Sequence, residues 1–227
     1  NFKIINSGIV ATINFNEIKD SLKKGSFKSK ILNTNLKFNF SFENKTLNVN
    51  NFFLRNKNIY FKNNSSILFE PYLEINSKFY IEELNTHILK NINFDQLYKF
   101  KDIIKKINSK NEIEYNSSKL SNTFIDNLNL KIVLAYGRIN YMKQFSIEGG
   151  DLKCKGNINL LDEFPLLFFN CSFLSKDKKK FLKKFSIKTK KEQETLNIKF
   201  EGNLNIVNNK INFKNIMIND DYVASKN

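Results

Sequence analysis

The sequence predicts a mainly β protein, a curved antiparallel sheet of repeated hairpins whose strands are apolar on one face only. Apolar and polar residues alternate strictly in several segments, as they do in half-buried strands. Asn-rich turns separate these segments. Phe supplies much of the apolar bulk, with 23 Phe and no Trp in 227 residues. We expect a trough or an open, taco-like barrel with one or two short helices packed on it.

Four runs show the alternation most clearly, and in each run the apolar residues share one face of a strand. Gly156 and Gly202 interrupt two of these runs, and a glycine inside a strand often marks a bulge or a bend. The apolar positions are Ile9, Ala11, Ile13 and Phe15; Leu36, Phe38, Phe40 and Phe42; Leu152, Cys154, Ile158 and Leu160; and Leu196, Ile198, Phe200, Leu204 and Ile206.

Two of the turns predict a hairpin register. Asn44-Lys45 is a two-residue loop of the type that adopts positive φ, and it places Phe42 opposite Leu47 and Phe40 opposite Val49. Asn208-Asn209 is read in the same way. It places Ile206 opposite Ile211 and Leu204 opposite Phe213.

The two hairpins align without a gap, so we interpret them as copies of one module. In both, an Asn (Asn51 or Asn215) shifts the apolar phase by one residue, as a bulge would. A weaker third copy is predicted to turn at Tyr136-Gly137-Arg138. An extended stack of hairpin modules follows from this repeat.

Other segments break the strand pattern. A helix is predicted over Asn93–Asn108, with Leu97, Phe100, Ile104 and Ile107 on one face, and a short basic helix over Lys176–Phe185. Asn16–Lys24 is a candidate helical turn. Lys110–Asn127 is polar and is predicted to connect two halves, 1–109 and 120–222, of a single β-rich segment spanning 1–227 of a longer protein.

The chain carries 37 basic and 22 acidic residues, a formal net charge of +15. This charge suits a polyanion or nucleic acid, an anionic membrane or an acidic partner. The lysines are spread along the chain, however, and a compositional bias toward Asn, Lys, Ile and Phe explains most of them. Alternation also sends Lys and Phe to opposite faces, which is poor for stacking bases on a charged platform.

No residue pattern predicts catalysis, so we expect a protein that is not an enzyme and has no cofactor or metal. His87 is the single histidine and has no Cys or acidic partner at metal-ligand spacing. The acidic doublets Glu82-Glu83, Asp162-Glu163 and Asp220-Asp221 are explained as solvated edges or turns. The seven glycines form no phosphate-binding loop.

The two cysteines, Cys154 and Cys171, flank a turn near Leu161–Pro165. If this segment folds as a hairpin, the two side chains lie opposite one another on the apolar face, close to disulfide range. Two free buried thiols are the alternative, and a slip of one residue would separate them. An oxidising compartment favours the disulfide.

Three segments resemble the AsmA-like family of bacterial envelope proteins, in particular the C-terminal regions of that family. They are Phe40–Val49, Gly150–Leu160 and Leu204–Phe213, each a short strand or strand pair. The resemblance implies a periplasmic body, a curved sheet with an apolar trough, and an inner-membrane anchor outside this segment. Related proteins are implicated in moving phospholipid between two membranes and in outer-membrane integrity. The helix over Asn93–Asn108 and the basic bias are not hallmarks of the family.

We therefore expect a periplasmic segment from a Gram-negative envelope protein that offers an apolar β trough for phospholipid transfer or outer-membrane maintenance. Its partners would be phospholipid or acyl chains and the inner or outer membrane, with no nucleic acid. A closed β scaffold is the alternative, and a polyanion or nucleic-acid binder is a weaker one. Headgroup contacts are expected at Lys178, Lys179, Lys180, Lys183 and Lys184. The expected lining residues are Ile9, Ile13, Phe15, Leu36, Phe38, Phe40, Phe42, Leu47, Val49, Leu152, Ile158, Leu160, Leu196, Ile198, Phe200, Leu204, Ile206, Ile211 and Phe213.

Overall fold

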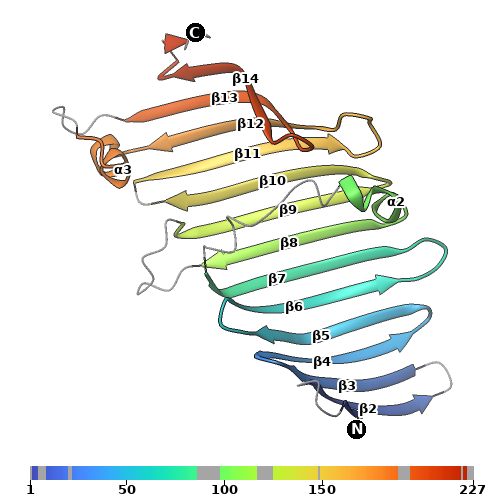
Figure 1. The fold of residues 1–227 in the computed structure, drawn as a ribbon. Helices are drawn as coiled ribbons and strands as arrows, with labels where there is room; N and C mark the ends of the chain where they lie inside the picture. The colour runs from blue at the N-terminus through green and yellow to red at the C-terminus, as the bar shows by residue number, and fades with distance from the viewer. Residues whose placement is uncertain are drawn as a thin grey trace.

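The computed structural model describes residues 2–4, 9–19, 22–85, 98–116, 125–147, 149–188, 195–220 and 222–223. Their strands form one sheet in which the spatial order follows the sequence order (Figure 1). The strands are β1 (Phe2–Ile4), β2 (Ile9–Lys19), β3 (Leu22–Ile31), β4 (Thr34–Glu43), β5 (Thr46–Arg55), β6 (Ile59–Leu68), β7 (Glu74–Leu84), β8 (Asn108–Asn116), β9 (Asn127–Ala135), β10 (Arg138–Ile147), β11 (Gly150–Asn159), β12 (Leu166–Ser175), β13 (Leu196–Asn205), β14 (Lys210–Ile218) and β15 (Tyr222–Val223).

The predicted fold class is confirmed, because the sheet is mainly antiparallel, curved and not closed (Figure 1). Two short helices, α2 (Lys101–Ile104) and α3 (Lys178–Lys184), accompany it in the described part of the chain. The pairing of β7 with β8 is parallel, while every other described pair is antiparallel. A parallel neighbour needs a crossover, and α2 lies in the crossover between these two strands.

The Asn44-Lys45 hairpin has the predicted register. Phe42 pairs with Leu47 and Phe40 with Val49. Asn44 and Lys45 have φ of 47° and 63°, the left-handed values that a tight hairpin turn of this hand requires. The bulge predicted at Asn51 is also present, since its φ is 53° and the pairing with β6 shifts between Val49 and Phe52.

The third predicted hairpin is also present. It turns at Tyr136-Gly137, both with positive φ, and pairs Leu134 with Ile139. The bulge predicted near Gly202 and Asn215 is seen as a register shift between Glu201 and Gly202.

The predicted register of the β13–β14 hairpin is wrong. Leu204 pairs with Ile211, and Gly202 pairs with Phe213. The turn covers residues 206–209 and begins earlier than predicted, because the Asn205 Oδ1 accepts hydrogen bonds from the backbone N–H groups of Val207 and Asn208. Ile206 thus leaves the strand and is buried at the sheet end, where its N–H donates to the Pro165 carbonyl over 3.4 Å.

Two predictions of non-strand structure are wrong. The described part of Asn16–Lys24 belongs to β2 and β3, which pair with each other. Residues 110–116 of the predicted connection belong to β8, which lies between β7 and β9 and joins both halves into one sheet. Most residues of β8 favour a strand only weakly, so β8 depends on its pairing with the two flanking strands.

The predicted helix over Asn93–Asn108 is too long at its C-terminal end. Helix α2 ends at Ile104, and Asn108 already donates its N–H to the Leu73 carbonyl as β8 begins. Phe100 is exposed, contrary to its predicted place on the packed face, whereas Ile104 does pack on the sheet. Residues 93–97 lie outside the described part of the chain.

Helix α3 agrees with the predicted basic helix. The Asp177 side chain caps its first turn by accepting a hydrogen bond from the Lys180 N–H over 2.9 Å. Phe181 packs on Phe173 of β12, with ring centroids 4.3 Å apart. None of the described helices is long and apolar enough to span a membrane.

Candidate functional site: the apolar face

Cross-strand partners point to the same face of a sheet, so the registers sort the strand residues into two faces. We call the face that carries Phe38, Phe79 and Phe200 the apolar face and the other the polar face. Leu160 and Ile206 occupy turns at the sheet end and are buried there. The other expected lining residues fall on the apolar face, Ile9 by its pairing with Ile31: Ile9, Ile13, Phe15, Leu36, Phe38, Phe40, Phe42, Leu47, Val49, Leu152, Ile158, Leu196, Ile198, Phe200, Leu204, Ile211 and Phe213.

One row of apolar-face residues crosses the sheet from β2 to β14 at mid-strand, and we call it the central row. Each neighbour in the row is a register partner, except Phe38 and Phe52, whose rings stack with centroids 5.9 Å apart across a bulge. The row therefore runs perpendicular to the strands, along the length of the sheet. Its members are Ile13, Phe27, Phe38, Phe52, Asn63, Phe79, Ile113, Leu130, Lys143, Cys154, Cys171, Phe200 and Ile216.

Aromatic rings cover the N-terminal part of this face. Phe27 and Phe38 stack with centroids 5.1 Å apart, and Phe52 and Phe61 with centroids 5.6 Å apart. Phe61 continues the series to Phe79 at 5.8 Å. These contacts link β3 to β7 by side chains alone, and they make this part of the apolar face a surface of ring faces and edges.

The two helices pack on the apolar face at opposite ends of the strands (Figure 1). Phe181 of α3 packs against a buried cluster of Ile147, Phe173 and Leu196. Ile104 of α2 packs against the second cluster, Ile158, Leu160 and Ile206, at the other strand ends. The middle of strands β10–β13 therefore lies between two helical borders.

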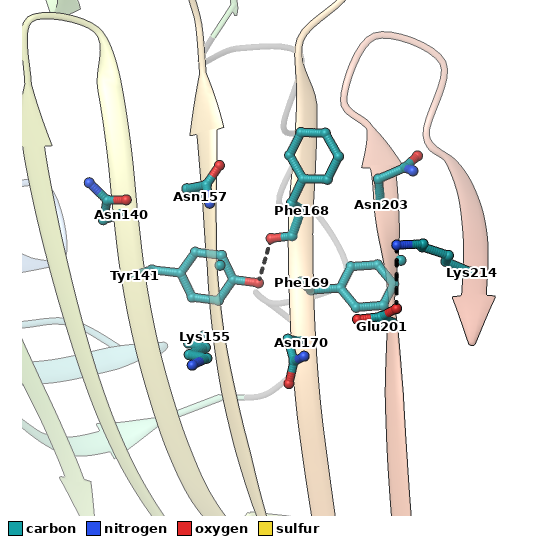
Figure 2. A pocket seen from close by; sticks show the side chains of 12 residues that line it. Asn140, Tyr141, Lys155, Asn157, Phe168, Phe169, Asn170, Glu201, Asn203 and Lys214 are labelled. Atoms are coloured by element: carbon teal, nitrogen blue, oxygen red, sulfur yellow. Dashed lines mark hydrogen bonds and ion pairs between the residues drawn. The ribbon is translucent and has the colours of Figure 1, made fainter. Parts of the chain in front are cut away.

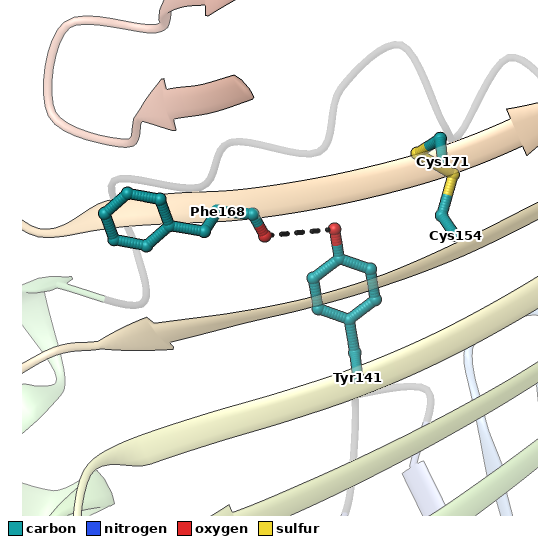
Figure 3. Close-up of a disulfide and its surroundings, with 4 residues drawn as sticks. All are labelled: Tyr141, Cys154, Phe168 and Cys171. Carbon is teal, nitrogen blue, oxygen red and sulfur yellow. Dashed lines mark hydrogen bonds between the residues drawn. A yellow bond between two sulfur atoms is a disulfide. The ribbon is translucent and has the colours of Figure 1, made fainter. Parts of the chain in front are cut away.

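Cys154 and Cys171 lie in this middle region, directly opposite one another as predicted. Their sulfur atoms form a disulfide that joins β11 to β12 (Figure 3), and both residues are buried. On the neighbouring strand, the Tyr141 hydroxyl lies 3.5 Å from the Phe168 carbonyl oxygen, to which it donates. The disulfide joins two adjacent members of the central row.

Lys143 occupies the adjacent step of the central row, between Leu130 and Cys154. Its Nζ lies 5.8 Å from the centroid of the Phe145 ring. Burial lowers the pKa of the Lys143 amine from its usual value of 10.5. Among the strand residues whose side chains the structure describes, the registers place one other charged group on this face, Lys23, near the N-terminal edge of the sheet.

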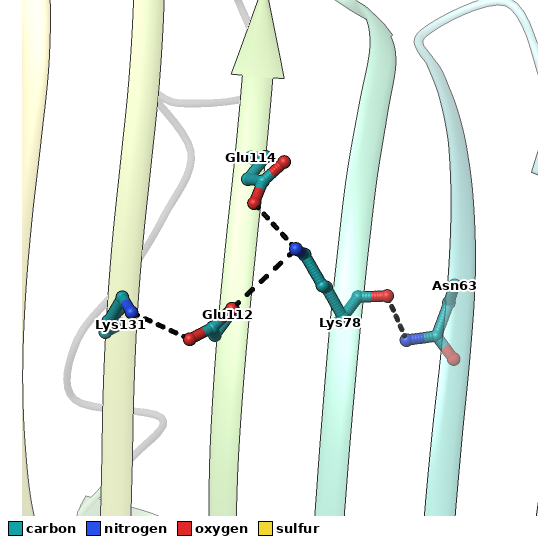
Figure 4. A network of polar contacts seen from close by, with 5 residues as sticks. All are labelled: Asn63, Lys78, Glu112, Glu114 and Lys131. Atoms are coloured by element: carbon teal, nitrogen blue, oxygen red, sulfur yellow. Dashed lines mark hydrogen bonds and ion pairs between the residues drawn. The ribbon is translucent and has the colours of Figure 1, made fainter.

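The polar face carries the ion pairs of the sheet. Lys78 contacts Glu114 at 3.0 Å and Glu112 at 4.0 Å, and Lys131 contacts Glu112 at 2.8 Å (Figure 4). The hydrogen bond that Lys78 donates to Glu114 is the main cause of the raised pKa of Lys78, and the bond that Lys131 donates to Glu112 lowers the pKa of Glu112. All of these side chains are solvent-accessible, so each pair contributes little to stability.

The acidic doublets belong to the same pattern. Glu82 pairs with Lys62 and Glu83 with Arg55, each over 2.9 Å, and Asp220 pairs with Lys199 over 2.7 Å. Ion pairing with Lys62, Arg55 and Lys199 thus accounts for Glu82, Glu83 and Asp220. His87 lies outside the described residues. Within the described ranges, no group of three or more His, Cys, Asp or Glu side chains is arranged to hold a metal ion.

A hollow of about 530 Å³ lies over strands β10–β14 (Figure 2). Gly156 and Gly202 contribute no side chain to it, and the Glu201–Lys214 ion pair borders it at 3.7 Å. Most of its other lining residues belong to the polar face, among them Lys155, Asn157 and Asn170. It differs from the Phe-lined and Ile-lined groove that a lipid trough would provide.

The lysines expected to contact headgroups lie on α3. Lys179, Lys180 and Lys183 are exposed, Lys178 is half-buried, and the side chain of Lys184 is outside the described set.

Lys143 was not identified from the sequence as a residue of the apolar face. The signal was present, because Ile139, Tyr141, Lys143, Phe145 and Ile147 alternate, and the lysine occupies an apolar phase of the run.

The chain matches no family model, no curated protein and no solved structure. The resemblance to AsmA-like proteins therefore stays a prediction.

Proposed function

We propose that this chain is a segment of a periplasmic envelope protein, anchored to the inner membrane through a region outside the segment. Its apolar face would bind acyl chains during phospholipid transfer or outer-membrane maintenance. One observation carries the proposal: the apolar face continues in register from β2 to β14. No second sheet of described strands covers it. The binding needs no covalent chemistry.

The exposure of the face supports this proposal. Ile13 and Phe15 near one edge of the sheet are 44% and 54% exposed, and Ile211 near the other edge is 55% exposed. Soluble proteins rarely leave large contiguous apolar patches open to water unless the patch binds something. Each acyl CH₂ buried on such a surface contributes roughly 0.8 kcal/mol.

The shape of the face decides how a chain would lie on it. Adjacent strands are about 4.8 Å apart, so a chain laid along the central row meets a new side chain at each strand, and only those of Asn63 and Lys143 are polar. An open surface of this kind covers one side of a chain. A closed scaffold would instead need a second layer over the same residues, and the described strands form only one layer.

The test is mass spectrometry of the purified protein under native conditions, with lipids identified after extraction. We expect co-purified phospholipid and uptake of a fluorescent phospholipid from vesicles. Phe38→Glu should abolish the uptake, because it places a charge in the central row. Its control, Lys37→Glu, places the same charge one residue away on the polar face. A lipid-free wild type that takes up no fluorescent lipid would contradict the proposal.

A further inference from the structure

Lys143 interrupts the apolar face at a position where the packing of the sheet does not require a charged side chain. The residue lies at mid-strand in β10, with Leu130 and Cys154 as its register partners and Tyr141 and Phe145 on the same face of its own strand. None of these neighbours is acidic. No ion pair joins the Lys143 amine to any carboxylate that the structure describes, and its Nζ lies over the Phe145 ring.

A half-buried ammonium group without a counterion is costly, because burial disfavours the charged form. Some lysines of the polar face have a carboxylate on the next strand within 4 Å, as Lys131 has Glu112. An anion supplied by a ligand would give Lys143 the same partner. The apolar side chains around it would accept the rest of that ligand.

We propose that Lys143 pairs with the ionised carboxylate of a long-chain fatty acid whose chain lies along the central row toward β6. This inference rests on the proposed function, because it assumes that the apolar face binds acyl chains. It adds the chemical class of the ligand and the residue that fixes its position.

The length of the central row fits one acyl chain. Between Lys143 and the next polar member, Asn63, the row consists of Leu130, Ile113 and Phe79. Four strand spacings of about 4.8 Å give a lane of about 19 Å. The acyl chains of one leaflet fill about 15 Å, half of the hydrocarbon core of a bilayer. A single chain therefore fits between the cation and the amide.

The position of Lys143 favours a carboxylate over a phospholipid headgroup. A headgroup is bulky, whereas a carboxylate is small. Lys143 is the sixth of ten residues in β10, and helices α2 and α3 border the strand ends on either side of this region. A phosphate also prefers several donors. The registers place one cation here, which matches one carboxylate.

The experiment compares hexadecanoic acid with its methyl ester as competitors of N-phenylnaphthylamine, an uncharged dye whose fluorescence rises on apolar surfaces. The ester has the same chain without the charge. We expect the wild type to bind the acid more tightly than the ester. Lys143→Met should lower the affinity for the acid roughly tenfold, about 1.4 kcal/mol, and leave that for the ester unchanged. Lys143→Arg should restore the preference for the acid.

Lys153→Met is the matched control, since it removes one positive charge from the adjacent strand on the polar face and should change neither affinity. Equal binding of acid and ester by the wild type, or a preference that survives Lys143→Met, would overturn this inference while the proposed function stands. Displacement of the dye by phosphatidylglycerol and not by the acid would overturn it as well. Failure of the dye to bind the wild type would instead contradict the proposed function.

Discussion

Lys143 shows how the face on which a residue lies changes its chemistry. On the polar face, Lys78 lies between two carboxylates, and its hydrogen bond with Glu114 raises its pKa. On the apolar face, the same side chain lies among Leu130, Phe145 and a disulfide, and burial lowers its pKa. Lysine is thus stabilised as a cation in one place and destabilised as a cation in the other.

This difference predicts a pH dependence of stability. The pKa of Lys143 is lower in the folded state than the unfolded value of 10.5, so the unfolded chain binds more protons between the two values. The free energy of unfolding should rise with pH through that window. Lys143→Met should be more stable than the wild type at neutral pH, and its advantage should disappear as pH passes 10.5. Tyr141 on the same face also titrates, with a pKa that burial raises.

Denaturant unfolding of both proteins at a series of pH values measures this effect. Lys153→Met serves as the control, because Lys153 is exposed on the polar face and its loss should leave stability unchanged at every pH. A Lys143→Met protein that is less stable than the wild type at neutral pH would contradict the assigned burial of the amine.

The hairpins are the elements that the sequence predicts best. The Asn44-Lys45 turn and the phase shift at Asn51 are local features of the sequence. Because the apolar residues of the two neighbouring strands must face the same side, only one pairing register satisfies the pattern. The register predicted for the Asn208-Asn209 hairpin was wrong, because the Asn205 side chain accepts backbone hydrogen bonds and starts the turn earlier. Two turns of similar composition therefore gave different registers.

The parallel pairing of β8 with β7 could not be predicted, because it depends on strands that are distant in the sequence. Apart from Ile113 and Tyr115, its residues are polar or weakly strand-forming, and its place is fixed by pairing with β7 on one side and β9 on the other. The central row had the same origin. Its residues come from thirteen strands, and only the register of every pair brings them into line.

The β11–β12 pair carries a prediction of its own. The disulfide closes a loop with a sequence separation of 17, and removing a cross-link of that size should lower the free energy of unfolding by about 3 kcal/mol. Cys154→Ala with Cys171→Ala should unfold at lower denaturant than the oxidised wild type. Thiol titration of the unfolded wild type checks the bond, and reductant should destabilise the wild type but not the double variant. Detection of two free thiols in the oxidised protein would refute the assignment.

At the scale of the whole molecule, one sheet separates two chemical surfaces. The polar face carries the cross-strand ion pairs and most of the lysines of the strands, which keep it in contact with water. The apolar face carries rings and branched side chains along the full length of the sheet, with helices at the ends of the C-terminal strands. The proposed function requires lipid to bind the apolar face and not the polar face.

The absence of Trp from the chain allows a direct measurement of that claim. Phe79→Trp places a single reporter in the central row, and Tyr80→Trp places one at the next position of β7, on the polar face. Phospholipid brominated in its acyl chains quenches Trp fluorescence on contact. We predict strong quenching of the Phe79→Trp protein and little quenching of the Tyr80→Trp protein. Equal quenching of both, or quenching of the Tyr80→Trp protein alone, would contradict the assignment of the apolar face as the lipid-binding surface.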